Sequence, residues 1–173
     1  MADVVLEHLN AERSVAVQAV PGAGKTRLLL DACAHTEEGE GCLVLAYNTQ
    51  LAAATLEEMH TRKLNKATCI TFHALCARCI GPARDDMQLE AAVAAAEAKT
   101  CTPCNVPASN RLLLDEAQDV RELYVRLLRV LGILDAASAI LVVGDAEQLI
   151  FDWDPEHLAT LETLRCPQQM LRG

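Results

Sequence analysis

Five short apolar runs alternate along this chain with longer stretches that suit helices. A continuous run such as 42–47, CLVLAY, is typical of a strand buried on both faces of a sheet. The expected strands lie at 15–20, 42–47, 67–70, 111–114 and 139–143. The expected helices lie at 4–10, 27–34, 50–60, 72–80, 85–99 and 120–131. Because strands and helices alternate, the pattern predicts an α/β fold with a parallel sheet of about five strands and helices on both faces.

The first expected strand runs into a turn with two glycines and then into a helix that begins with lysine and threonine. Small residues let backbone N–H groups surround an anion, and the helix N-terminus adds partial positive charge. Lys25 would reach the terminal phosphates of a nucleotide and Thr26 would hold Mg2+. Ala19 stands where the strict phosphate-loop pattern has glycine. The alternative is an ordinary strand-to-helix turn with a solvated lysine. The candidate nucleotide-binding residues are Pro21, Gly22, Ala23, Gly24, Lys25, Thr26 and Arg27.

A second segment, LLLDEAQD at 112–119, places two acids directly after an apolar run. The carboxyl ends of parallel strands meet at one edge of a sheet, so these acids are expected beside the phosphate loop. Asp115 would bind Mg2+ directly or through water, and Glu116 would polarise an attacking water. Acids after a strand can instead serve as helix N-caps, but the phosphate loop upstream favours the catalytic interpretation.

A third segment, LVVGDAEQLIFDW at 141–153, repeats this construction with an apolar strand, a glycine and an acid. Gln148 follows that strand, where a side-chain amide can hydrogen-bond a γ-phosphate. Four of the five aromatic residues, all except Tyr124, lie just after expected strands or in these loops. Rings at the carboxyl edge of a sheet can stack on unpaired bases, although packing under a loop is the alternative for each.

Length and charge narrow the class of protein. A chain of 173 residues suits one domain with a single core. The net charge of −9 argues against unspecific nucleic-acid binding, but it leaves room for a local basic groove. No apolar run approaches a membrane span, and the N-terminus is acidic where a signal peptide is basic. We therefore expect an intracellular protein, cytoplasmic or nuclear, without membrane contact.

Taken together, these segments resemble the nucleotide-binding half of superfamily 1 DNA helicases of the UvrD/Rep type. The phosphate loop is AVPGAGKT, the magnesium segment is DEAQD and the third segment is GDAEQLIFDW. Between them, LVLAYNTQLA and TFHALC are similar to the family's single-strand-contacting motifs, and LETLRCPQQM is similar to the start of its fourth motif. The resemblance covers about residues 9–172. It implies a single RecA-like P-loop NTPase domain over 1–173.

The resemblance also implies roles for individual residues. ATP and Mg2+ would be the cofactors, and Lys25, Glu116, Gln148 and Arg165 would be catalytic, with Arg165 touching the γ-phosphate. Single-stranded nucleic acid, with DNA favoured by the family, would be the partner. The residues that would contact the strand are Tyr47, Asn48, Thr71, Phe72, His73, Phe151 and Trp153.

Several positions depart from the family pattern. Arg13 stands where a glutamine usually selects adenine, and Leu164 stands where an aromatic residue usually stacks on it. Asp154 and Pro155 replace an arginine-glycine pair, and the insertion at about 81–110 is much reduced. No second RecA-like domain is expected within the chain, so another chain would have to supply the second motor domain.

The eight cysteines raise two further questions. They are scattered through strand and helix patterns, so reduced thiols are favoured over disulfides. Cys76, Cys79, Cys101 and Cys104 form two C-x-x-C pairs, which resemble a structural zinc site. Because Cys76 lies within TFHALC and a helix separates the pairs, packing is the favoured explanation. Cys33, Cys42, Cys69 and Cys166 are expected to pack as small apolar groups.

Three functions fit these observations to different degrees. The leading hypothesis is an ATP-hydrolysing DNA helicase domain. The second is a non-motor module that binds nucleotide or single strands, or docks on a helicase partner. A small-molecule kinase is the third and least favoured, because a kinase does not need the DEAQD and GDAEQ segments together with base-stacking rings in this order.

Overall fold

The computed structural model describes residues 2–20, 22–36, 40–145 and 171–172. Its strands are β1 (Val15–Ala19), β2 (Cys42–Ala46), β3 (Ala67–Thr71), β4 (Arg111–Leu114), β5 (Ala139–Asp145) and β6 (Leu171–Arg172). Its helices are α1 (Ala2–Asn10), α2 (Lys25–Ala34), α3 (Thr49–Thr61), α4 (Phe72–Cys79), α5 (Asp86–Glu97), α6 (Glu122–Val130) and α7 (Ile133–Ala136), with a short 3-10 turn η1 at Ala117–Asp119.

All six strands belong to one sheet in the order β3-β2-β4-β5-β1-β6, and every pair is parallel. The five predicted strands and the α/β class are therefore confirmed. The sequence did not predict β6 or α7, which are only two and four residues long and too short to produce a periodic pattern. One feature of the order matters for the site: β5 lies between β1 and β4.

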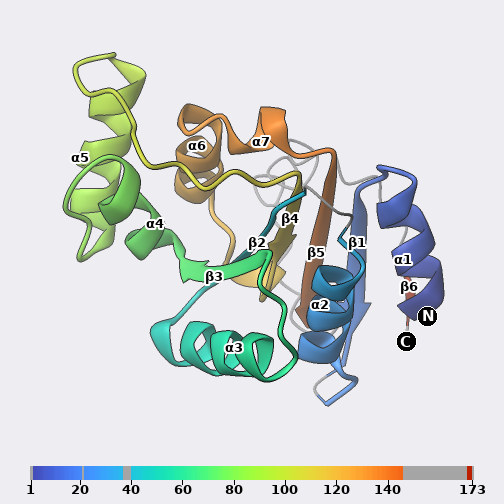
Figure 1. The fold of residues 1–173 in the computed structure, drawn as a ribbon. Helices are drawn as coiled ribbons and strands as arrows, with labels where there is room; N and C mark the ends of the chain where they lie inside the picture. Colours follow the sequence, from blue (N-terminus) through green and yellow to red (C-terminus); the bar gives the residue numbers. More distant parts are fainter. Residues whose placement is uncertain (1, 21, 37–39, 146–170, 173) are drawn as a thin grey trace.

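Both faces of the sheet are covered (Figure 1). Alternate side chains of the same strand enter two separate cores. In β2, Leu43 and Leu45 join the core beneath α4, α5, α6 and α7, whereas Val44 joins the core beneath α1, α2 and α3. All five residues of β2 are buried, which confirms the interpretation of its continuous apolar run. The sheet is thus fixed from both sides, which holds its loops at the carboxyl edge in place.

The ends of three helices are set by polar side chains at the edge of the sheet. The side chains of Asn48, Thr71 and Asp85 accept hydrogen bonds from the third backbone N–H beyond them, on Leu51, Ala74 and Gln88. Each bond satisfies an N–H group that the first helical turn leaves without a partner. The boundaries of all six predicted helices lie within two residues of the observed ones. In the 120–131 stretch, α6 begins at Glu122, after the separate turn η1.

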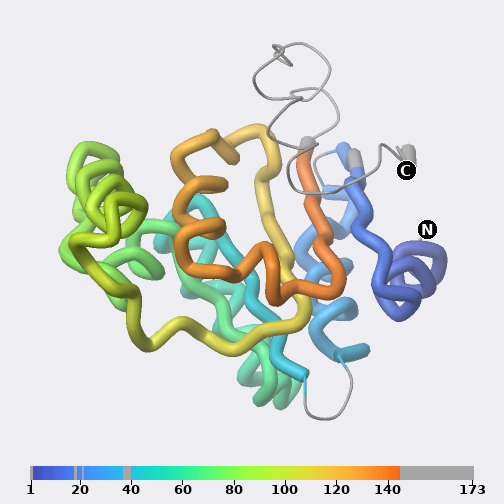
Figure 2. Tube along the Cα trace, turned by 90° about the horizontal axis from the view of Figure 1, so that it is seen from above, coloured from blue at the N-terminus to red at the C-terminus, as the bar shows by residue number. Residues whose placement is uncertain are grey.

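The segment between α4 and β4 lies at the end of the molecule opposite α1 (Figure 2). It contains α5, which packs against α4 and α6. Arg126 of α6 binds both carboxylate oxygens of Glu97 at 2.9 and 2.6 Å, which joins the middle of α6 to the C-terminal end of α5. Within the described part of the chain, none of the helices has the length and apolar character needed to cross a membrane.

Gly41 marks a close approach that the sequence did not reveal. A side-chain carbon there would overlap the backbone oxygen of Ala108 and lie 3.2 Å from its carbonyl carbon. We expect Gly41→Ala to lower the free energy of unfolding by about 2 kcal/mol and the Tm by roughly 4 to 8 °C, because two backbones must separate. Gly81→Ala is the control, since a side-chain carbon there meets nothing within 4 Å. Thermal unfolding with equal Tm values for both variants would contradict this packing.

Candidate functional site

The phosphate loop connects β1 to α2 at the carboxyl edge of the sheet. Gly22 and Gly24 have φ angles of 81° and 86°, in the left-handed region that favours glycine. The N–H of Ala23 donates to the backbone oxygen of Val20 at 3.1 Å, which closes the turn. Among the residues that the structure describes, a side-chain carbon added at Gly22 would meet nothing within 4 Å. The backbone therefore offers an exposed turn at a helix N-terminus, as an anion site requires.

Lys25 and Glu116 meet although 91 positions separate them in the sequence. The ammonium Nζ of Lys25 lies 3.4 Å from Oε2 of Glu116, and the two side chains are 14% and 28% exposed. Gln118 donates from Nε2 to the same oxygen at 2.8 Å. The predicted neighbourhood of the phosphate loop and the acids after β4 is therefore present. Thr26 and Arg27 are exposed, and Arg27 pairs with Asp31 at 3.8 Å.

Glu116 adopts a backbone conformation that is unusual for a residue with a side chain. Its φ and ψ are 50° and 62°, in the left-handed region, directly before η1. Non-glycine residues in this region are held there by their surroundings and cluster at functional sites. Here the strained turn begins just after β4 and presents the carboxylate towards Lys25. The sequence carried no indication of this conformation, because glycine is absent from DEAQD.

Asp115 is buried, and its carboxylate accepts a hydrogen bond from the N–H of Glu116 at 2.9 Å. Burial, reinforced by the nearby charge of Glu116, raises the pKa of Asp115 above its ordinary value. The negative charge of this buried carboxylate is disfavoured by burial and by the charge of Glu116, so a bound cation would stabilise it. Carboxylate and hydroxyl oxygens are hard ligands, so the pair of Asp115 and Thr26 has the chemistry that suits Mg2+.

The raised pKa of Asp115 predicts its contribution to stability. Because the folded state disfavours the charged carboxylate, this group lowers stability at neutral pH, and the penalty shrinks as the pH falls through the folded-state pKa. We expect Asp115→Asn to raise the Tm of the magnesium-free protein at pH 7, because the amide carries no charge to desolvate. Thermal unfolding in EDTA measures it, and the gap should narrow as the pH is lowered. A variant that unfolds earlier than the wild type at pH 7 would contradict the account.

The strand β5 separates the phosphate-loop strand from the acidic strand. Ala19 of β1 is in register with Asp145 at the end of β5, and Leu114 of β4 is in register with Val142. The end of β5 therefore lies between the phosphate loop and the acids. The sequence continues from this end into the segment that contains Gln148. The predicted residues Pro21, Gln148, Phe151, Trp153 and Arg165 themselves lie outside the described residues.

A cavity of about 170 Å³ lies next to the phosphate loop. Val17 and Ala19 of β1 form part of its apolar wall, while Arg27 and Asp31 of α2 add charged groups. Ala23, Gly24 and Lys25 belong to the same lining, so the cavity is continuous with the loop. A ligand held by the loop has adjacent space with both apolar and charged walls.

The residues predicted to contact single-stranded nucleic acid occupy three different environments. Tyr47 is 43% exposed directly after β2, as a stacking ring requires. Asn48 and Thr71 use their side chains as N-caps of α3 and α4. Phe72 is only 2% exposed, and its ring stacks on Tyr124 at 4.3 Å, so in this structure it is a core residue and a base cannot reach its face. Contact between the other residues and single-stranded nucleic acid stays a prediction.

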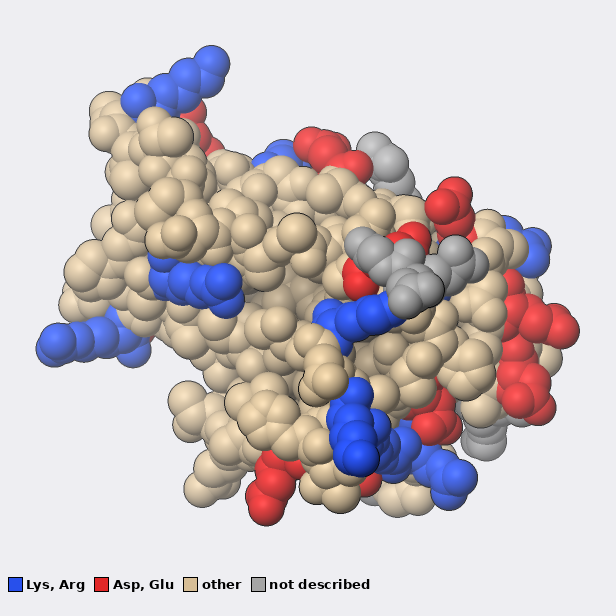
Figure 3. Space-filling view, viewed as in Figure 1, with Lys and Arg blue, Asp and Glu red and all other residues tan. Residues whose placement is uncertain are grey.

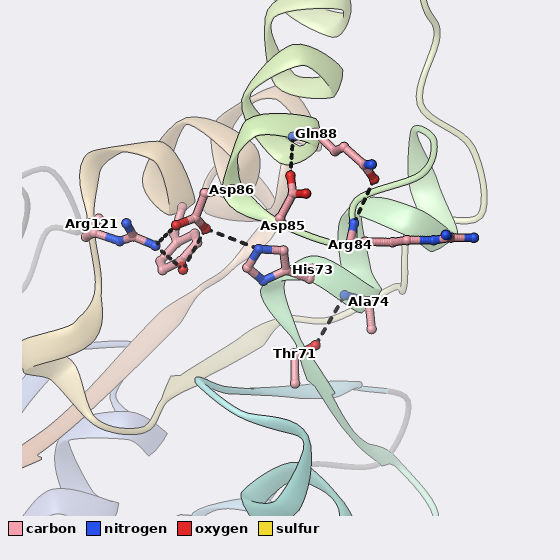
Figure 4. A network of polar contacts seen from close by, with 9 residues as sticks. Thr71, His73, Ala74, Arg84, Asp85, Asp86, Gln88 and Arg121 are labelled. Atoms are coloured by element: carbon pink, nitrogen blue, oxygen red, sulfur yellow. Dashed lines mark hydrogen bonds and ion pairs between the residues drawn. The ribbon is translucent and has the colours of Figure 1, made fainter.

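His73 belongs to a network that the sequence did not reveal (Figure 4). Its Nε2 lies 3.1 Å from Oδ1 of Asp86, and the guanidinium of Arg121 lies 2.7 Å from Oδ2 of the same carboxylate. The hydroxyl of Tyr124 also reaches Asp86, and Arg121 lies over the Tyr124 ring at 4.8 Å from its centre. These residues come from α4, α5 and the start of α6, so no local pattern could have joined them.

Arg111 is a second residue whose role was missed. It is buried at the start of β4, where its guanidinium donates to the backbone oxygen of Ala32 at 3.0 Å and to Oδ1 of Asn10 at 3.3 Å. It thereby ties the ends of α1 and α2 to the sheet and satisfies a carbonyl in the last turn of α2. Its role is structural support behind the phosphate loop.

Five of the seven cysteines in the described part of the chain are buried, whereas Cys101 is partly buried and Cys104 is exposed. Cys33, Cys42 and Cys69 are buried, as predicted, and Cys166 lies outside the described residues. Among the residues that the structure describes, no group of three or more histidine, cysteine or acidic side chains is placed to hold a metal ion. Burial raises the pKa of the Cys76 thiol to about 11, which disfavours the thiolate that zinc needs. The zinc alternative at Cys76, Cys79, Cys101 and Cys104 finds no support there.

Charge is unevenly spread over the visible face of the molecule (Figure 3). Acidic side chains gather towards the α1 end, whereas Lys and Arg side chains project at the end formed by α4 and α5 and also across the lower middle of this face. The net charge of −9 is therefore compatible with a local region that attracts phosphates.

Comparisons with known proteins agree with this geometry. A family model described as AAA domain (AAA_19) matches residues 3–153. Among solved structures, the helicase domain of Hef from Pyrococcus furiosus is similar in fold, with a TM-score of 0.62 and 15% sequence identity. The alignment covers 99% of this chain and 37% of that one, so this chain spans little more than a third of the helicase domain that it matches. No curated protein matches the sequence. Because that family model covers most of the sequence, the chain belongs to this AAA domain family.

Proposed function

We propose that the chain is the ATP-binding motor domain of a superfamily 1 DNA helicase, which binds and hydrolyses ATP with Mg2+ and contacts single-stranded DNA. The observation that carries this proposal is the contact of Lys25 with Glu116 at 3.4 Å. It joins a phosphate loop to a strained acidic turn at one edge of the sheet. A phosphate-binding lysine and a water-activating carboxylate at such a distance suit hydrolysis of a terminal phosphate.

Nucleotide binding would rearrange the contact between Lys25 and Glu116. The ammonium of Lys25 would move from Glu116 to the β- and γ-phosphate oxygens, which carry more negative charge. Glu116 would then be free to orient a water molecule and accept its proton, while Gln118 still donates to Oε2. Thr26 and Asp115 would hold Mg2+, which when bound neutralises charge on the phosphate oxygens. Gln148, after β5, would report the γ-phosphate.

Single-stranded DNA would bind at the same edge of the sheet, at the ends of β2 and β3. Tyr47 follows β2 and His73 lies in α4 directly after β3, so both lie on the side of β4 away from β1. An exposed tyrosine ring can stack on a base at roughly 1 to 3 kcal/mol. Motors of this type move by changing the gap between two RecA-like domains, so movement would need a second such domain beside this one.

A non-motor binding module is the second candidate, and two observations favour it. Phe72 is buried under the surface, and His73 is already paired with Asp86. Two of the expected strand contacts are thus engaged within the protein. Such a module would bind nucleotide or a partner without unwinding anything.

ATPase turnover measured against protein concentration, with and without oligothymidylate, separates the two candidates. A motor domain should hydrolyse ATP faster with the strand, and its rate per chain should rise with concentration if copies assemble. A module should bind ATP and show no strand-stimulated turnover at any concentration. Absence of ATP binding would overturn the motor domain and leave only a module that binds single strands or a partner.

A further inference from the structure

One carboxylate at the strand-binding edge is surrounded by three hydrogen-bond donors. Asp86 receives the imidazole Nε2 of His73 at 3.1 Å, the guanidinium of Arg121 at 2.7 Å and the hydroxyl of Tyr124 at 3.4 Å (Figure 4). Arg121 and Tyr124 come from the start of α6, and His73 comes from α4. Together they form a cradle for oxygen atoms that carry negative charge.

The cradle belongs to an open cavity of about 330 Å³ that also includes Tyr47. Its floor is rigid, because Tyr124 stacks on the buried ring of Phe72 at an interplanar angle of 11°. The side chain of Arg84 borders the cavity but points away from Asp86 in Figure 4. The cavity therefore combines a rigid donor set with one exposed aromatic ring, the two elements that bind a nucleotide unit of a single strand.

Asp86 can leave the cradle without disturbing the fold. Its side chain is 45% exposed, and it is the first residue of α5. The cap of that helix is made by Asp85, whose carboxylate accepts from the N–H of Gln88 at 2.9 Å. A rotation of the Asp86 side chain towards solvent would thus leave both the helix start and the core intact. The contact with Arg121 lowers the pKa of Asp86, so the group is charged at neutral pH.

We propose that this cradle is a phosphate subsite for the backbone of single-stranded DNA and that Asp86 is its internal occupant. The proposal rests on the proposed function and adds Arg121 and Asp86 to it. A backbone phosphate presents the same kind of oxygens to His73, Arg121 and Tyr124, while the neighbouring base would stack on Tyr47. Carboxylate and phosphate repel each other, so only one of them occupies the cradle. Asp86 accordingly weakens strand binding until a phosphate displaces it.

The chain contains a matched pair of control residues. Arg126 and Glu97 join the same two helices, α6 and α5, through the same kind of ion pair, at 2.6 Å. Neither residue lines the cavity. The test compares Asp86→Asn with Glu97→Gln, and Arg121→Ala with Arg126→Ala. Fluorescence anisotropy with labelled oligothymidylate at several salt concentrations measures strand affinity, and thermal unfolding confirms that each variant is folded.

Asp86→Asn is expected to tighten the binding of single-stranded DNA about fivefold. This change in affinity corresponds to the free energy of one exposed ion pair, which the phosphate would no longer have to break. Arg121→Ala is expected to weaken binding and to reduce the slope of log K against log salt by about 0.7, the contribution of one phosphate on a single strand. Glu97→Gln and Arg126→Ala should change neither quantity.

The outcomes separate this proposal from the broader function. If the wild type binds the strand and Asp86→Asn binds equally or more weakly, the subsite is wrong while the proposed function stands. If neither the wild type nor Asp86→Asn binds, both the subsite and strand contact are overturned. Binding by Asp86→Asn alone would support an occupied cradle. Should Asp86→Asn prove unfolded, the Arg121→Ala salt slope decides, and an unchanged slope overturns the subsite.

Discussion

Glu116→Gln is expected to lower ATP turnover by about 100-fold to 10 000-fold while leaving ATP affinity within a few-fold of the wild type. The substitution keeps the size of the side chain and its contact with Gln118, but an amide cannot accept a proton from water. The strained backbone at φ 50° positions this side chain near Lys25. Single-turnover hydrolysis together with a binding titration separates the chemical step from affinity.

Glu122→Gln is the control for this prediction. Glu122 is an exposed acid in the first turn of α6, paired with Arg129 at 3.8 Å and separate from the loop. Its substitution should leave turnover unchanged. If Glu116→Gln hydrolyses ATP at the wild-type rate, another group activates the water and the assignment of Glu116 is wrong.

Lys25→Ala is expected to weaken ATP binding by at least about 100-fold. Charge-assisted hydrogen bonds contribute roughly 1.5 to 3 kcal/mol each, and the lysine would make such bonds to the terminal phosphates. Fold stability should change little, because the contact with Glu116 is long, at 3.4 Å, and partly exposed. Isothermal titration calorimetry with ATP measures the effect.

Lys66→Ala serves as the matched control, because Lys66 is exposed in the turn before β3. Removing its charge alters the net charge of the protein by the same amount without touching the phosphate loop. Equal ATP affinities for the Lys25 and Lys66 variants would show that the loop does not bind phosphate.

The fold was largely predictable because its determinants are local. The five main strands are short apolar runs, and the buried run of β2 has no polar position to suggest solvent on either face. The phosphate loop was equally accessible, since Gly22 and Gly24 occupy the positions that need a positive φ. The sequence did not predict β6 and α7, which are too short to show periodicity, or the close backbone approach at Gly41.

The candidate site was predictable only for residues that directly follow β-strands, because parallel strands end at the same edge of the sheet. Lys25 and Glu116 meet because β1 and β4 end at the same edge. In contrast, the position of α5 against α4 and α6 decides that Asp86 pairs with His73, and nothing in the sequence around either residue reports that packing. Phe72 shows the same limit, because whether a ring after a strand faces solvent or Tyr124 depends on how α6 packs.

The central claim is that the phosphate loop and the acids after β4 form one nucleotide site, and equilibrium titration of the wild-type chain with ATP tests it most directly. With Mg2+ present, we expect saturable binding of one ATP per chain, competed by ADP, at a Kd within the range of roughly 1 μM to 1 mM typical of enzyme substrates. Binding should weaken by at least about tenfold in EDTA, since the buried charge of Asp115 then lacks its cation. Absence of saturable binding at ATP concentrations well above that range would contradict the account.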